Sequence, residues 1–181
     1  MNFLKVEFHE LYARHLCRHS QYGNNVIHLA MVFGTYLGLF GIAGTILGSP
    51  WPALVVPVLY MVVLAFNVPV RVWLVSLLFV IGLCAATVAL PEMPIWLPIG
   101  LVVVCYFVQN WSHKLYDKAA DMTELNKKYR KGPALFVLLL IYELPLLLNY
   151  LCFDTSNWVD VLPPAWHFAA AKKTETAAVD K

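Results

Sequence analysis

The chain has 181 residues, of which 60% are hydrophobic and only 13% are charged, and its formal net charge is +2. Soluble domains are nearer half apolar and a quarter charged, so this composition excludes an ordinary soluble domain and indicates an all-α integral membrane protein. The small net charge, without a basic stripe of interleaved aromatics, also argues against nucleic-acid binding. The length suits one compact helical bundle, which we expect to occupy residues 1–168.

Residues 3–22 carry apolar and imidazole side chains at helical spacing, with charged side chains between them. Phe8, Leu11 and His15 fall on one face of such a helix, whereas Glu7 and Arg14 fall on another. An amphipathic helix of this kind lies in the headgroup layer of a membrane. We expect the interfacial helix to be broken at residues 21–24.

Five apolar runs follow, and each is a candidate membrane-spanning helix. They cover residues 26–47, 51–66, 72–90, 95–111 and 133–152. Tryptophans near several of the expected helix ends are typical of an interfacial aromatic belt. A four-span alternative stays open, in which the second and third runs form a re-entrant hairpin. The small and polar residues 169–181 predict a disordered tail.

The first apolar run contains pairs of glycines four residues apart. Gly34 and Gly38 form one such pair, and Gly44 and Gly48 form another. Because this spacing lets a second helix approach closely, we interpret these glycines as packing positions.

Positive charges gather on alternate sides of the expected spans. The N-terminal segment and residues 114–132 are rich in Lys and Arg, whereas residues 48–52 and 91–94 contain neither. Positively charged loops stay in the cytoplasm, so we expect the N-terminus and the 114–132 segment on the cytoplasmic side.

Four histidines reach this same side of the membrane in the five-span topology. His15, His19 and His28 precede or open the first run, and His113 follows the fourth. Histidines gathered at one membrane face can build a metal site, although histidines are also common at membrane interfaces without a metal. We predict that these four histidines are metal ligands.

Polar side chains four residues apart project from the same face of a helix. Three such pairs lie near the expected cytoplasmic face: His15 and His19, Asn24 and His28, and His113 and Asp117. Imidazole and carboxylate ligands with open positions are the set that non-haem Fe(II) oxygenases use. Such a site can bind O2 together with a 2-hydroxy carboxylate. The candidates for holding the substrate carboxylate are Arg14, Arg18, Lys114 and Lys118.

Two further polar positions bear on this site. Gln109 lies one turn before His113 and could orient that imidazole. Glu143 lies about ten residues into the last run, which is about 15 Å along a helix and close to the bilayer centre. An ionisable group at that depth is functional or has a partner. The alternative is a protonated structural carboxyl, bonded to Asn67, Gln109 or Asn149.

Two segments resemble a known family. The first has Tyr-x-x-His at Tyr12 and His15, then His19, then Asn-x-x-Ile-His ending at His28. The second has Gln-x-x-x-His at 109–113, then the acidic Asp117, and Pro-Ala-Leu at 133–135. Together they resemble the small membrane 2-hydroxy-fatty-acid dioxygenases of α-oxidation, long catalogued as a domain of unknown function. Ser112 stands here where the family has glycine, and residues 118–131 stand as an insertion.

The resemblance implies an Fe(II) enzyme, with Fe²⁺ as its cofactor, that uses O2 to shorten a 2-hydroxy fatty acid by one carbon. It implies a location in the endoplasmic reticulum or the bacterial inner membrane, among membrane lipids. Its site carries over to His19, Asn24, His28 and His113. With these we group Gln109 and Asp117, so that Asn24, Gln109 and Asp117 are the expected catalytic residues.

Two other interpretations stay open. A b-type haem protein would use His28 and His113 as axial ligands. A non-catalytic lipid-binding or scaffold protein would use the basic 114–131 segment to contact anionic lipid. A diiron desaturase fits poorly, because the chain has only six histidines and none are adjacent.

Overall fold

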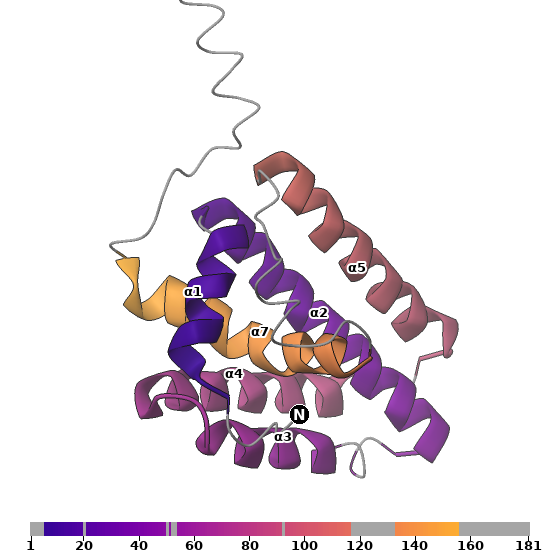
Figure 1. The fold of residues 1–181 in the computed structure, drawn as a ribbon. Coiled ribbons are helices and arrows are strands. Elements are labelled where there is room, and N and C mark those ends of the chain that lie inside the picture. Colours follow the sequence, from indigo (N-terminus) through magenta and orange to yellow (C-terminus); the bar gives the residue numbers. More distant parts are fainter. Residues whose placement is uncertain are drawn as a thin grey trace, which may run out of the picture.

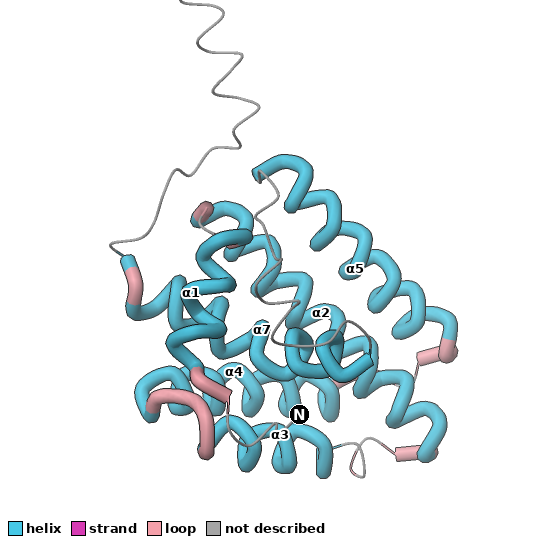
Figure 2. The backbone as a smooth tube through the Cα atoms, viewed as in Figure 1, coloured by secondary structure: helices cyan, strands magenta, loops and turns pink. Residues whose placement is uncertain are grey.

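The computed structural model of the protein describes residues 6–19, 21–49, 51, 54–91, 93–116 and 133–155. Within these ranges the elements are all helices and there is no strand, so the all-α prediction is confirmed (Figure 1 and Figure 2). The helices are α1 (Phe8–Arg18), α2 (Tyr22–Leu47), α3 (Val55–Ala65), α4 (Val70–Ala89), α5 (Trp96–Tyr116) and α7 (Pro133–Phe153). The expected tail at 169–181 lies outside the described residues.

Helix α7 is the central element of the bundle. It contacts α1, α2 and α4, while α2 lies alongside α5 and α3 pairs with α4 (Figure 1). Its side chains at Leu138, Tyr142, Leu144, Leu147 and Tyr150 are almost completely buried. A helix that is apolar on every side is stable only when neighbours surround it, which explains its place in the middle.

A proline fixes the path of α7 through this core. Pro145 has no N–H, so the carbonyl of Ile141 loses its usual helical donor. Tyr60 of α3 donates its hydroxyl to that carbonyl at 2.9 Å. Tyr36 of α2 donates to the preceding carbonyl, that of Leu140, at 2.8 Å. Two neighbouring helices therefore hold α7 at one place along its length.

Glycines set the spacing and register of α2 against α5. A Cβ built on Gly34 would lie 2.6 Å from Cys105 Sγ, and one on Gly38 would lie 2.8 Å from the Pro98 carbonyl oxygen. The expected packing role is therefore confirmed for these two glycines. Gly48 differs, because it ends α2 in the left-handed conformation at φ 66° with nothing packed against it. It serves as the helix cap and not as a packing position.

The break after the first helix lies earlier than the sequence predicts. Helix α1 ends at Arg18 and α2 already begins at Tyr22, so residues 22–24 are helical. The side-chain amide of Asn25 donates to the carbonyls of His19 and Gln21, at 2.5 and 2.9 Å. These bonds satisfy carbonyls that the turn would otherwise expose, and they allow the second helix to start at once.

Two helices, α2 and α4, are long and apolar enough to cross a membrane, judged by length and composition. Helix α3 has 11 residues and is about 16 Å long, which is shorter than the ~30 Å hydrocarbon core. The sequence places a span at 51–66, but this helix begins at Val55 and stops at Ala65, shortly before Pro69. The helix lengths therefore do not establish five spans.

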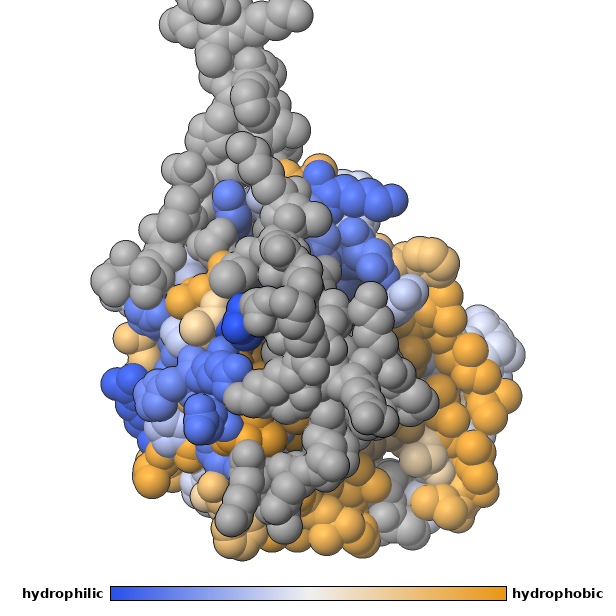
Figure 3. Space-filling model, viewed as in Figure 1, coloured by the Kyte–Doolittle hydropathy of each residue, from blue (hydrophilic) through white to orange (hydrophobic). Residues whose placement is uncertain are grey.

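The described surface exposes many large hydrophobic side chains. Hydrophobic side chains cover the outer side of α5 and the lower edge of the view at α3, and hydrophilic ones gather near α1 (Figure 3). Val58, Leu78 and Phe107 are each more than 60% exposed, whereas Asn24 and His28 are buried. Apolar side chains outside and polar ones inside suit a bundle whose solvent is lipid.

Candidate metal centre

Three histidines from three separate segments meet near the α1 end of the bundle. His19 follows the last residue of α1, His28 lies in the second turn of α2, and His113 lies in the last turn of α5. Their ring centroids are 4.5 to 4.8 Å apart, and one ligand nitrogen from each lies within 4.8 Å of the others. His19 and His28 are buried and His113 is half-buried. We call these residues the three-histidine cluster.

The register of α2 against α5 brings two of these histidines together. The two helices run antiparallel, with Gly23 against Tyr116 near one end and Gly38 against Pro98 further along. In that alignment His28 falls opposite His113, and the rings touch edge to face. The early turn after α1 then brings His19 against both rings. The cluster is thus a consequence of close glycine packing and a short turn.

A carboxylate from the central helix holds one imidazole. His28 Nδ1 donates to Glu143 Oε1 of α7 at 3.0 Å. With the proton on Nδ1, the lone pair of His28 lies on Nε2, which is buried and has no hydrogen-bond partner among the described residues. The partners expected for a structural carboxyl at Glu143 were Asn67, Gln109 or Asn149, and none of these bonds to it among the described residues. Helix α7 passes beside α2 at this level, which spacing along the chain could not reveal.

His15 lies beside the cluster and not within it. Its ring stacks on His19 with centroids 4.3 Å apart and planes 5° from parallel. Its Nε2 is 2.9 Å from Asn25 Oδ1, so this nitrogen is engaged by an amide oxygen. Burial lowers the pKa of His15 to about 3, although the bond to Asn25 opposes the shift. His15 is therefore neutral, and its contacts support the ring of His19.

A polar link joins α2 to α5 one residue before His113. Ser112 Oγ donates to Asn24 Oδ1 at 2.8 Å and also lies 2.8 Å from the carbonyl oxygen of Gln109. Asn24 and Ser112 are fully buried. Asn24 and Gln109 were expected site residues, whereas Ser112 was not, although it directly precedes a candidate ligand in the sequence. The structure brings these residues to the edge of the cluster and does not test their catalytic role.

The structure describes the remaining expected site residues only in part. Arg14 is half-buried on α1 and Lys114 is exposed on the last turn of α5. Arg18 ends α1, but its side chain is not described. Asp117 and Lys118 lie outside the described residues. Their roles in ligation and substrate binding therefore remain predictions.

The donor set fits a transition-metal ion. A metal bound by three imidazoles lies ~2.1 Å from each nitrogen, so each ring would move inward by under about 1 Å from the separations seen here. The buried Nε2 of His28 is a donor for such an ion, and its Nδ1 already has the outer hydrogen bond that histidine ligands usually make. Imidazole suits zinc, copper, iron and nickel alike, so these three ligands do not identify the metal.

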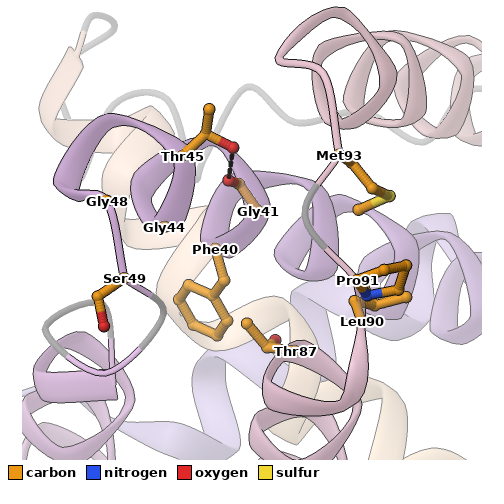
Figure 4. Close-up of a pocket in the computed structure, with 10 residues that line it drawn as sticks. All are labelled: Phe40, Gly41, Gly44, Thr45, Gly48, Ser49, Thr87, Leu90, Pro91 and Met93. Atoms are coloured by element: carbon orange, nitrogen blue, oxygen red, sulfur yellow. Dashed lines mark hydrogen bonds between the residues drawn. The ribbon is translucent and has the colours of Figure 1, made fainter.

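Two hollows in the described surface lie away from the cluster. A cavity of about 260 Å³ is bordered by Phe40, Thr45, Thr87 and Leu90, with Phe40 and Thr87 pointing into it (Figure 4). Thr45 is 17 residues beyond His28 on α2, which corresponds to about 25 Å along the helix. An apolar groove of about 530 Å³ runs between α3 and α4 and contains no histidine. Neither hollow belongs to the metal centre.

No protein-family model, curated protein or solved structure matches this chain. The function of the protein is therefore inferred from the geometry of the three-histidine cluster and from the resemblance of its two sequence segments.

Proposed function

We propose that the protein is an integral membrane Fe(II)-dependent dioxygenase that shortens 2-hydroxy fatty acids by one carbon. The observation that carries this proposal is the three-histidine cluster, buried in a bundle whose outer surface is apolar. Polar groups inside a membrane bundle are costly and mark functional sites. A lipid-like substrate suits a site at that position, and the family resemblance supplies the substrate class.

In this proposal His19, His28 and His113 hold the metal, and Asp117 completes the ligand set. Bound by these residues, Fe(II) would activate O2, while the 2-hydroxy acid would itself supply the electrons that reduce O2 to water and would lose its carboxyl carbon as CO2. Three neutral imidazoles and one carboxylate would leave a net positive charge on the metal, which favours an anionic substrate. The polar link of Asn24 and Ser112 holds α5 beside α2, so that His113 keeps its position.

The proposed placement in the membrane has five spans, with the N-terminus and the cluster on the cytoplasmic side. On that side Arg14, Arg18, Lys114 and Lys118 hold the substrate carboxylate, while the acyl chain lies among apolar side chains. The membrane is the endoplasmic reticulum or the bacterial inner membrane. Exposed apolar surface on α3, α4 and α5 supports contact with lipid.

The geometry favours a mononuclear ion over haem. A porphyrin needs its two axial imidazoles on opposite faces of a wide flat ring. Here the rings of His28 and His113 are 4.6 Å apart and both touch the ring of His19. That triangle leaves no space for a macrocycle between His28 and His113.

Metal content tests the proposal directly. Protein purified without chelators and reconstituted with Fe(II) under anaerobic conditions should bind about one iron per chain, as one cluster of ligands allows. His28→Ala and His113→Ala should lose the iron, whereas His9→Ala is a matched control on an exposed part of α1. The loaded protein should then consume O2 and release the shortened fatty acid, measured by mass spectrometry. A wild-type protein that binds no iron after reconstitution would overturn the proposal.

A further inference from the structure

Glu143 is a carboxylate in an apolar helix, and its surroundings are unusually well defined. Its chain neighbours Tyr142 and Leu144 are almost completely buried, and its own side chain is 25% exposed. A carboxylate in such a place is costly unless a hydrogen-bonding partner compensates for lost water. The described partner is His28, whose Nδ1 lies 3.0 Å from Oε1.

Two neighbouring helices, α2 and α3, bind the backbone of α7 just before Glu143. Tyr36 and Tyr60 donate to the carbonyls of Leu140 and Ile141, which lie three and two residues before Glu143. Pro145 follows two residues later and prevents a regular helical bond at this turn. Helices α2 and α3 therefore hold the backbone of α7 next to Glu143, independently of the contact between its carboxylate and His28.

The hydrogen bond selects one tautomer of His28. A proton on Nδ1, facing the carboxylate, leaves the lone pair on Nε2. Carboxylate, imidazole and metal in a row are a recurrent arrangement in which the outer carboxylate orients the ring and increases its basicity. A negative charge beside neutral ligands also reduces the cost of placing a dication in an apolar bundle.

We propose that Glu143 is a positioning residue of the metal centre, which acts through His28 by fixing its ring orientation and its Nδ1–H tautomer before any metal binds. This inference rests on the proposed function only in requiring that the cluster binds a divalent metal. It does not depend on iron, on O2 or on a hydroxy-acid substrate. The competing role is purely structural, in which the bond merely ties α7 to α2.

The first test uses metal-free, full-length protein in detergent micelles with ¹⁵N-labelled histidine. Imidazole nitrogen shifts distinguish the two tautomers, and the spectrum of His28→Gln assigns the resonances of His28. Wild-type His28 should be in the Nδ1–H form, and Glu143→Leu should shift it towards the Nε2–H form because the acceptor is gone. An Nε2–H form in the wild type would overturn the proposal.

The second test titrates Co(II) into the same preparation and follows its visible absorption bands. Glu143→Gln, which keeps the volume of the side chain, should weaken Co(II) binding by about 10- to 100-fold, as is typical for loss of an outer carboxylate. The control is Thr87→Val, which removes a buried hydroxyl of α4 that bonds only within its own helix, beside the cavity away from the cluster, and should leave Co(II) affinity unchanged. Equal affinities for Glu143→Gln and the wild type contradict the positioning role.

The outcomes separate this inference from the proposed function. Co(II) binding that depends on Glu143, in a protein that does not turn over 2-hydroxy fatty acids, retains the positioning role and rejects the dioxygenase. Turnover of 2-hydroxy fatty acids that is unaffected by Glu143→Gln retains the dioxygenase and rejects the positioning role. A wild-type chain that binds no Co(II) rejects the positioning role as well.

Discussion

Tyr60 of α3 donates its hydroxyl to the carbonyl of Ile141, the one carbonyl of α7 that Pro145 leaves without a helical donor. The proline therefore does not simply weaken the helix. It creates an acceptor in the protein interior, and a tyrosine from a neighbouring helix supplies the donor. This bond lies two residues from Glu143, so the same local feature that interrupts α7 also helps to place the carboxylate beside His28.

Tyr60→Phe should destabilise the protein because it leaves the Ile141 carbonyl buried without a partner. We expect a loss of about 1–3 kcal/mol in the free energy of unfolding, the usual cost of an unsatisfied buried acceptor. Unfolding in detergent, followed by circular dichroism, measures it. Tyr106→Phe removes an exposed hydroxyl from α5 and should change stability by less than about 0.5 kcal/mol. Equal effects of the two substitutions would show that the bond contributes nothing specific.

Gly38→Ala should force α2 away from α5. The new Cβ would meet Val102 Cγ2 at 2.7 Å and the Pro98 carbonyl oxygen at 2.8 Å, and backbone atoms cannot yield as side chains can. We expect a cost of about 1–3 kcal/mol from overpacking, together with weaker Co(II) binding because His113 moves away from His28. Gly82→Ala in α4 meets nothing within 4 Å. Gly82→Ala should instead stabilise its helix by about 0.5–1 kcal/mol. A Gly38→Ala variant with unchanged stability would contradict the close approach of α2 to α5.

These glycines show what the sequence could predict. Intervals of four residues within one helix depend only on helical geometry, so the packing role of Gly34 and Gly38 was accessible, as were the helices themselves from apolar periodicity. The expected five-span topology placed His19, His28 and His113 at one membrane face, and the structure brings these three side chains together. Which helix would lie opposite remained open, because it is decided by contacts between distant segments.

The contacts of Glu143 and His15 show where the sequence was insufficient. The bond from Glu143 to His28 joins residues 115 positions apart, and nothing in either segment indicates the other. His15 shares a helical face with His19, so ligation was a reasonable prediction, but Asn25 engages its Nε2 instead. Asn25 lies next to Asn24, and spacing along the chain did not indicate that Asn25 would contact His15.

The contribution of Tyr12 to the free energy of unfolding should decrease at alkaline pH. Its hydroxyl donates to Asp154 Oδ2 at 2.5 Å, and burial, together with this carboxylate, raises its pKa well above the ordinary value of 10. The folded protein therefore retains the phenol proton that the unfolded chain loses above pH 10, so the free energy of unfolding should fall as pH rises beyond 10. Tyr12→Phe should remove this part of the pH dependence, measured by unfolding between pH 8 and 11 (about the accessible range). A slope unchanged in Tyr12→Phe would assign the effect to other groups.

Asn25→Leu should disrupt the turn and the cluster together. Its amide binds the carbonyls of His19 and Gln21, and its oxygen binds His15, so one buried side chain satisfies three polar groups. Their loss should cost about 1–3 kcal/mol or more, because several buried groups lose their partners at once. His19 would then lose its fixed position, and Co(II) binding should weaken by at least as much as in Glu143→Gln. Asn110→Leu, which removes only a local bond on an exposed part of α5, should leave Co(II) binding intact. Wild-type Co(II) affinity in Asn25→Leu would mean that the histidines assemble around the metal without help from this turn.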